Sequence, residues 1–141
     1  MLDSDIVYGK IGIIQRCLKR IKDVTSLDPA KLDEIDCQDV FVLNLQRAVQ
    51  AALDLAAHII AAEGFGMPRE LKEHFRFLRE QGIIGKDISQ RMEKMVGFRN
   101  IAVHEYEKLD TEVLKHILTI HLKDLEEFYS EILSYYKLEG N

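Results

Sequence analysis

The chain has 141 residues, of which 47% are hydrophobic and 30% charged, and its 19 basic and 24 acidic side chains leave a net charge of -5. This length suits one domain, and the balance of apolar and charged residues excludes a disordered chain. The negative charge argues against general nucleic-acid binding, which depends on an excess of Lys and Arg. No apolar run reaches the roughly 18 residues of a membrane span.

Hydrophobic residues recur at helical spacing along the whole chain, and only two prolines and a few glycine-containing breaks interrupt them. The spacing predicts five helices, over residues 4–23, 36–62, 69–81, 88–106 and 110–136. Tight turns between helices of this length are typical of an antiparallel bundle. We therefore expect an all-α fold, a four- to five-helix bundle.

Capping residues set the expected helix starts. Asp36 and Asp87 are the expected N-caps of the second and fourth helices, and Asp110 or Thr111 caps the fifth. Pro68 suits the first turn of the third helix. The apolar side of the fifth helix could pack on its own bundle or on a second chain, and the sequence leaves both open.

The first residues and the cysteines indicate where the protein works. The opening Met-Leu-Asp-Ser-Asp lacks the basic and apolar regions of a signal peptide. Cys17 and Cys37 lie far apart and form no CxxC pair, which favours a reducing compartment over a disulfide or zinc scaffold. We expect one domain over residues 1–141, cytoplasmic and without a membrane partner.

Several kinds of catalytic chemistry lack their motifs here. The sequence contains no Glu-x-x-His pair, HExxH, P-loop or GxGxxG. His116 and His121 are five residues apart, which separates them by about 140° on an α-helix, so they are not expected to share a metal. His58 and His74 are expected to be ordinary half-buried or surface histidines. We expect no metal and no cofactor.

The end of the fourth predicted helix departs from its own pattern. Arg99 falls within an apolar stripe, and Tyr106 returns to the same side seven residues later. A buried cation costs several kcal/mol unless it is paired or opens to a cleft. Asn100 could orient the imidazole of His104, because the two are spaced i, i+4. Arg99 and His104 diverge by about 140° on an ideal helix, so they converge only at a distorted helix end or across a dimer interface.

An alternative interpretation gives this segment a structural role. In that case Arg99 pairs with a buried acid such as Asp54, and His104 and Tyr106 form an ordinary helix end. Tyr106 would then be a packing residue whose hydroxyl finds a hydrogen-bond partner.

The string Arg99-Asn-Ile-Ala-Val-His104-Glu-Tyr106 resembles the Arg-x4-His-x-Tyr motif of HEPN-domain ribonucleases, specifically the HepT-like toxins. Residues 42–47, 54–59 and 94–100 also resemble that family at matching places, so the resemblance covers nearly the whole chain. It implies a helical homodimer with the two motifs lining one cleft. It also implies RNA cleavage without a metal, with tRNA as the substrate of some members.

The resemblance further implies a role for each residue of the site. His104 would act as general acid or base, since histidine titrates near neutral pH. Arg99 would bind the phosphate and stabilise the transition state. Asn100 would have a positioning role in the site, and Asp54 is the candidate to orient Arg99. In this type VII-like toxin–antitoxin pair, a minimal nucleotidyltransferase antitoxin would add AMP to Tyr106, and its phosphate would compete with substrate for the arginine.

Two other functions fit the same bundle, a non-catalytic partner that regulates a nucleotidyltransferase and a bare dimerisation module. The second leaves Arg99 in an apolar stripe without a reason.

The net charge bears on the nuclease hypothesis through its distribution, because residues 9–22 contain five basic side chains and no acid. These and Lys94 could rim a local RNA site, while the negative remainder would limit indiscriminate RNA coating.

Overall fold

The computed structural model describes residues 2–140, and this range contains helices and no strand. The α-helices of the described range are α1 (Ser4–Thr25), α2 (Ile35–Glu63), α3 (Leu71–Glu80), α4 (Lys86–His104), α5 (Thr111–His116) and α6 (Leu122–Tyr135). The described range also contains two 3-10 turns (Pro29–Asp33 and Tyr106–Lys108) and a π-helical turn (Ile117–His121). The predicted all-α class is confirmed.

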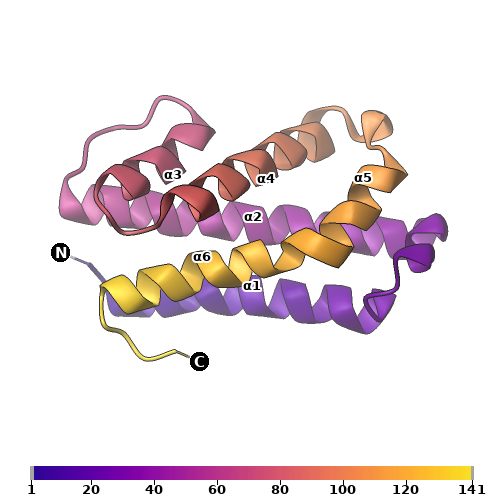
Figure 1. Cartoon of the computed structure of the whole chain (residues 1–141), viewed down its shortest axis with the longest axis horizontal. Helices are drawn as coiled ribbons and strands as arrows, with labels where there is room; N and C mark the ends of the chain where they lie inside the picture. Colours follow the sequence, from indigo (N-terminus) through magenta and orange to yellow (C-terminus); the bar gives the residue numbers. More distant parts are fainter. Residues whose placement is uncertain (1, 141) are drawn as a thin grey trace.

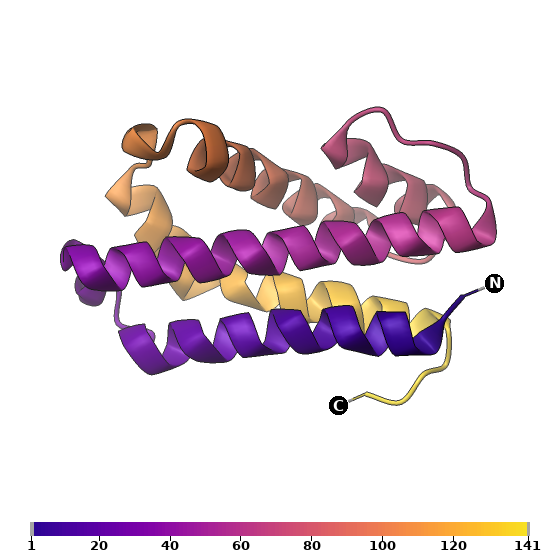
Figure 2. The same ribbon diagram turned by 180° about the vertical axis from the view of Figure 1, so that it is seen from behind.

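Four of the helices form an antiparallel bundle (Figure 1). Helix α1 packs on α2 and α6, α2 also packs on α4, and α4 packs on α6, which closes the ring. Helix α3 lies against α2 and α4 near the start of α4. The bundle therefore leaves the last turns of α4 free of α3, beside α2 (Figure 2).

The core follows from the helical spacing of apolar residues. On α1 the buried positions include Val7, Ile11, Ile14 and Ile21, which recur at intervals of three, four and seven and so face one side. Where α3 meets α6, the rings of Phe75 and Phe128 pack edge to face with centroids 5.3 Å apart, a favoured aromatic geometry.

The helix starts follow the expected caps only in part. Asp110 is confirmed as an N-cap, since its carboxylate accepts the backbone N–H two residues later at 2.9 Å. Asp36 and Asp87 lie inside their first turns instead, because Glu34 and Gly85 occupy the N-cap positions. Both carboxylates still complement the positive end of the helix dipole.

The predicted ends of the third and fourth helices also differ from the structure. Helix α3 begins at Leu71, so Pro68 precedes its first turn. Helix α4 ends at His104 rather than at Tyr106, because Glu105 leaves the helical region of backbone conformation with φ of -142°. Tyr106 therefore opens a separate 3-10 turn.

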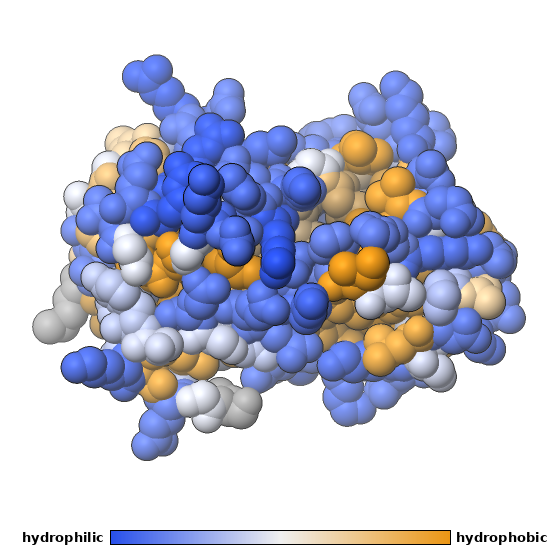
Figure 3. All heavy atoms as spheres, viewed as in Figure 1, coloured by the Kyte–Doolittle hydropathy of each residue, from blue (hydrophilic) through white to orange (hydrophobic). Residues whose placement is uncertain are grey.

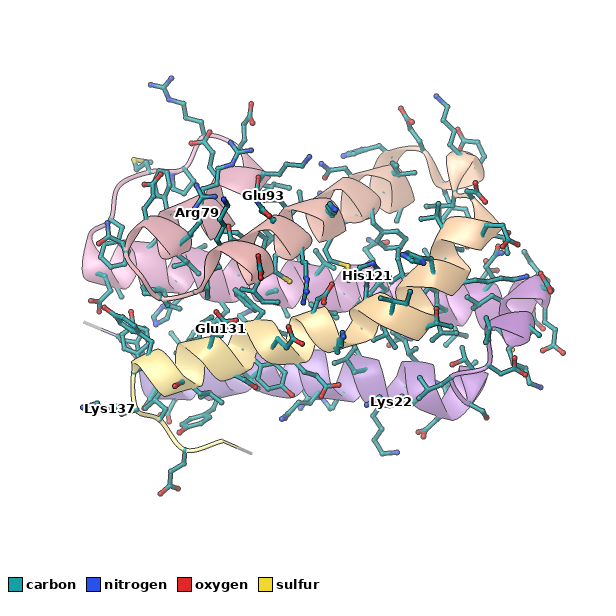
Figure 4. The ribbon with its side chains drawn as sticks, viewed as in Figure 1. Lys22, Arg79, Glu93, His121, Glu131 and Lys137 are labelled. Carbon is teal, nitrogen blue, oxygen red and sulfur yellow. The ribbon has the colours of Figure 1, made fainter. Side chains whose placement is uncertain are left out.

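The predicted fifth helix is one helical segment that the π-helical turn divides into α5 and α6. A π turn holds more residues than an α turn, so it brings side chains five positions apart together. The rings of His116 and His121 accordingly lie 5.0 Å apart at their centroids, and the expectation that they diverge is wrong. Figure 4 shows His121 at this turn.

Neither a metal cluster nor a membrane span occurs in the described residues. Over positions 2–140, no group of three or more His, Cys, Asp or Glu is arranged to hold a metal ion. Within the same range, every helix is too short or too polar to cross a bilayer. Cys17 and Cys37 are free thiols.

Candidate active site at the end of helix α4

The candidate site lies on the last turns of α4, where polar side chains interrupt the apolar stripe. Arg99 and Asn100 are half-buried, whereas His104, the last residue of α4, is exposed. Helix α2 runs antiparallel beside this segment and supplies the partners of Arg99 and Tyr106. Two helices therefore hold the site in place.

Neutral amides hold the Arg99 guanidinium. Its Nη2 donates to Oε1 of Gln50 at 3.1 Å, and its Nη1 donates to Oδ1 of Asn100 at 3.1 Å. The Nε atom is buried without a hydrogen-bond partner. Because no carboxylate pairs with Arg99 in the described part of the chain, its positive charge stays available to an anion.

Asp54 reaches Arg99 only through Gln50. One carboxylate oxygen of Asp54 accepts from Nε2 of Gln50 at 2.9 Å, and the other pairs with the Lys10 ammonium at 3.3 Å. The Asp54 side chain is 41% exposed. The alternative in which Arg99 pairs directly with a buried Asp54 is therefore wrong, and Lys10 is the direct cationic partner of that carboxylate.

His104 is exposed, and its imidazole forms no hydrogen bond to another side chain of the described range. The expected contact with Asn100 is not formed, because the Asn100 side-chain oxygen accepts from Arg99 instead. Helix α4 is α-helical through His104, so helix distortion does not bring His104 to Arg99 within one chain. The exposed imidazole is open to a substrate or to a second copy.

Tyr106 lies just beyond α4 and turns toward α2. The residue is 42% exposed, and its hydroxyl donates a hydrogen bond to the carboxylate of Asp39. Burial, together with this hydrogen bond and the negative charge of Asp39, raises the pKa of Tyr106 to about 12. The hydroxyl is therefore neutral at physiological pH and has a carboxylate beside it that can take its proton.

On its other side, α4 borders a cavity of about 320 Å³. Its apolar lining includes Phe98 and Ile101 from α4 and Val113 and Ile117 from the segment that follows. Figure 3 shows apolar atoms exposed on this face, between α4 and α5. Lys94 contributes a cation to the lining. Arg99 and His104 do not line this cavity.

The basic run on α1 is largely paired. Lys19 pairs with Asp23 at 2.9 Å and Lys22 with Glu126 at 3.4 Å, and Figure 4 shows Lys22 pointing away from α4. Arg16 and Arg20 are exposed without an ion pair to other described residues. The expected basic rim is therefore smaller than the sequence suggests.

Sequence reasoning missed Gln50 and Asp39, the two α2 residues that contact Arg99 and Tyr106. The available signal was periodicity, because Gln50 lies one helical turn before Asp54 and so shares its face. Neither residue type marks a site by itself, and the pairing of α2 with α4 was needed to identify them.

Comparison with known proteins gives the family. Residues 14–132 match the family described as Ribonuclease HepT-like. The chain is 37% identical over 129 residues to the mRNA nuclease HepT of Shewanella oneidensis, across 92% of this chain and 97% of that one. It is 26% identical over 136 residues to the tRNA nuclease HepT of Aphanizomenon flos-aquae, across 95% and 92% of the two chains.

A solved structure agrees with these relatives. The tri-AMPylated HEPN toxin of Shewanella oneidensis, in complex with MNT antitoxin, superposes with a TM-score of 0.87 at 37% identity, over 92% of this chain and 98% of that one. The family match, the sequence identity and the fold extend over nearly the same residues, and this chain belongs to the HepT-like ribonuclease family.

Proposed function

We propose that this protein is a metal-independent ribonuclease toxin that acts as a homodimer and is silenced when a cognate nucleotidyltransferase adds AMP to Tyr106. The observation that carries the proposal is the guanidinium of Arg99, held by two neutral amides on the same helix as the exposed His104. An unneutralised arginine is suited to bind a phosphate, and an open imidazole can transfer protons.

The chemistry needs only side chains of this site. One His104 imidazole takes the proton of a ribose 2′-OH, whose oxygen attacks the adjacent phosphorus. The bond to the 5′-oxygen breaks, and a second, protonated imidazole supplies the proton to that leaving oxygen. The products are a 2′,3′-cyclic phosphate and a 5′-hydroxyl. Arg99 stabilises the charge on the phosphate oxygens, as preorganised donors do in other phosphoryl transfers.

A homodimer supplies the second imidazole. On a regular helix, Arg99 and His104 diverge, so one chain does not aim both at one phosphate. Exposed apolar side chains lie beside the motif and across the cavity, with Ile101 and Val103 each 40% and Val113 50% exposed. Apolar patches of this kind mark interaction surfaces. Two copies that meet over this surface would bring the ends of their α4 helices, and with them their motifs, next to one another.

The position of Tyr106 supports the proposed regulation at this residue. Tyr106 is 42% exposed, and its hydroxyl contacts Asp39 of α2, the helix that also holds Arg99. Transfer of AMP would place a phosphate near the cations of the cleft, where it competes with RNA. Intact-mass measurement after co-expression with the antitoxin should show a gain of AMP, localised to Tyr106 by peptide mapping.

The proposed function is tested by RNA cleavage in the presence of EDTA. We expect the purified protein to cleave tRNA or total RNA under these conditions, and His104→Ala to abolish cleavage. His74→Ala is the matched control, because His74 lies on α3 and hydrogen-bonds to backbone carbonyl groups. Cleavage that survives His104→Ala, or that EDTA stops, would overturn the proposed mechanism.

The same experiment separates the second candidate function. A non-catalytic partner of a nucleotidyltransferase would keep an accessible Tyr106 but would not need an unneutralised Arg99. It predicts a tight complex with the antitoxin and no cleavage by the free protein at any RNA concentration.

A further inference from the structure

Gln50 occupies a position between two charged groups that no sequence motif marks. Its side-chain oxygen accepts from Arg99 at 3.1 Å, and its side-chain nitrogen donates to Asp54 at 2.9 Å. The orientation of this amide is unambiguous, because a guanidinium only donates hydrogen bonds and a carboxylate only accepts them. The amide thus links α4 to the α2 carboxylate without bringing their charges into contact.

We propose that Gln50 is a positioning residue of the ribonuclease site, which aligns the Arg99 guanidinium while leaving its charge unneutralised. This inference rests on the proposed function, since it concerns how Arg99 meets a phosphate. The Asp54 carboxylate holds the nitrogen end of the Gln50 amide, and the Lys10 ammonium, 3.3 Å from the other carboxylate oxygen, compensates the charge of Asp54. Lys10 is therefore the cation that pairs with Asp54, and the positive charge of Arg99 stays unneutralised.

The hydrogen-bond capacity of Arg99 supports this role. A guanidinium has five N–H donors, of which one goes to Gln50 and one to Asn100. The Nε–H is buried without a partner. One hydrogen on each terminal nitrogen therefore remains, and these two can bind a phosphate in bidentate fashion. Gln50 and Asn100 hold the plane of the group, which determines where that pair points.

Two substitutions at this position separate geometry from charge. In Gln50→Ala the charge of Arg99 stays but its orientation is lost, so we expect kcat for RNA cleavage to fall about 10- to 100-fold with little change in KM. In Gln50→Glu the shape is kept, but a carboxylate neutralises Arg99. We expect KM to rise about 10-fold at low salt.

Gln90→Ala is the matched control, because Gln90 is an exposed glutamine near the start of α4. It should leave both kinetic constants and the thermal unfolding midpoint unchanged. Equal kinetics for Gln50→Ala and the control would overturn the inference. The same follows if Gln50→Ala changes only the thermal midpoint, or if Gln50→Glu retains the KM of the parent protein.

A measurement without RNA keeps this test independent of the proposed function. The rotation rate of the Arg99 guanidinium, from ¹⁵N nuclear magnetic resonance, should rise in Gln50→Ala and not in Gln90→Ala. An unchanged rate shows that Gln50 does not hold the group, even in a protein that cleaves RNA. Absence of cleavage by the parent protein, with a faster rotation in Gln50→Ala, would instead reject the nuclease and retain the positioning.

Discussion

The two halves of α4 contribute to the protein in opposite ways. Residues near its start, such as Ile88 and Met92, are buried, and the Ser89 hydroxyl donates to a backbone carbonyl of α3. Near its end, Ile101 and His104 are exposed, and α2 is joined to the helix by polar contacts. The packed face of the first half fixes the position of the second half, which is then free to present reactive groups.

The largest expected effect comes from a substitution in the packing around the first half of α4. Phe75→Ala removes the ring that packs on Phe128 and should lower the free energy of unfolding by about 3–5 kcal/mol. Urea unfolding followed by circular dichroism measures this change. RNA cleavage per folded molecule should stay near that of the parent protein, because the site lies at the other end of α4. A parallel loss of specific activity would contradict this separation.

Next in size is a change in the reactive half. Arg99→Ala should reduce kcat/KM for RNA cleavage by about 10²- to 10³-fold, as removal of one preorganised donor does elsewhere. Its effect on unfolding should be small, because the group contributes hydrogen bonds to two amides and little core. Steady-state cleavage and urea unfolding on the same samples provide the comparison, and an intermediate loss in Arg99→Lys would separate charge from the planar fork.

A smaller effect is expected at the apolar face beside the site. Val113→Asp introduces a charge at an exposed apolar position and should weaken self-association by about 1–3 kcal/mol. Sedimentation at a series of concentrations measures it. Met67→Asp is the control, since Met67 is 89% exposed in the loop before α3. Equal association of both variants would mean that the dimer uses another face.

The smallest expected effect concerns Tyr106. Asp39→Asn removes the carboxylate that helps hold the phenol in its neutral form, so the pKa of Tyr106 should fall from about 12 partway toward its ordinary value, with burial sustaining the remainder. Ultraviolet titration against a Tyr106→Phe baseline follows the shift. Asp36→Asn is the charge-matched control, and an unshifted titration in Asp39→Asn would contradict the contact.

The stability of the folded protein should follow the same titration. The raised pKa means that the folded state keeps the Tyr106 proton more firmly than the unfolded chain does. The corresponding stability is fully present below about pH 10 and is lost as the pH rises toward about 12. In Asp39→Asn the pKa of Tyr106 should lie closer to its ordinary value, so the pH range over which this stability is lost should be narrower.

Prediction from the sequence succeeded where local rules decide the outcome. The five helical segments and the Asp110 cap follow from periodicity and from side-chain capping. Errors arose at Tyr106 and at His116 and His121, which flank the π-helical turn or end it, because helix ends and extra residues in a turn depend on how neighbouring elements pack. The apolar stripe marked Arg99 as unusual, the resemblance to HEPN ribonucleases made Arg99 and His104 the catalytic candidates, and their catalytic roles stay a prediction.

The sequence alone determined that the chain is helical and which eight residues carry the motif, since both are properties of local order. Tertiary structure decided which groups meet. It replaced the expected contact of Arg99 with Asp54 by one through Gln50, and it paired Tyr106 with Asp39. The contacts of Arg99 with Gln50 and of Tyr106 with Asp39 join positions 49 and 67 residues apart, and only the packing of α2 against α4 brings such distant residues within hydrogen-bond range.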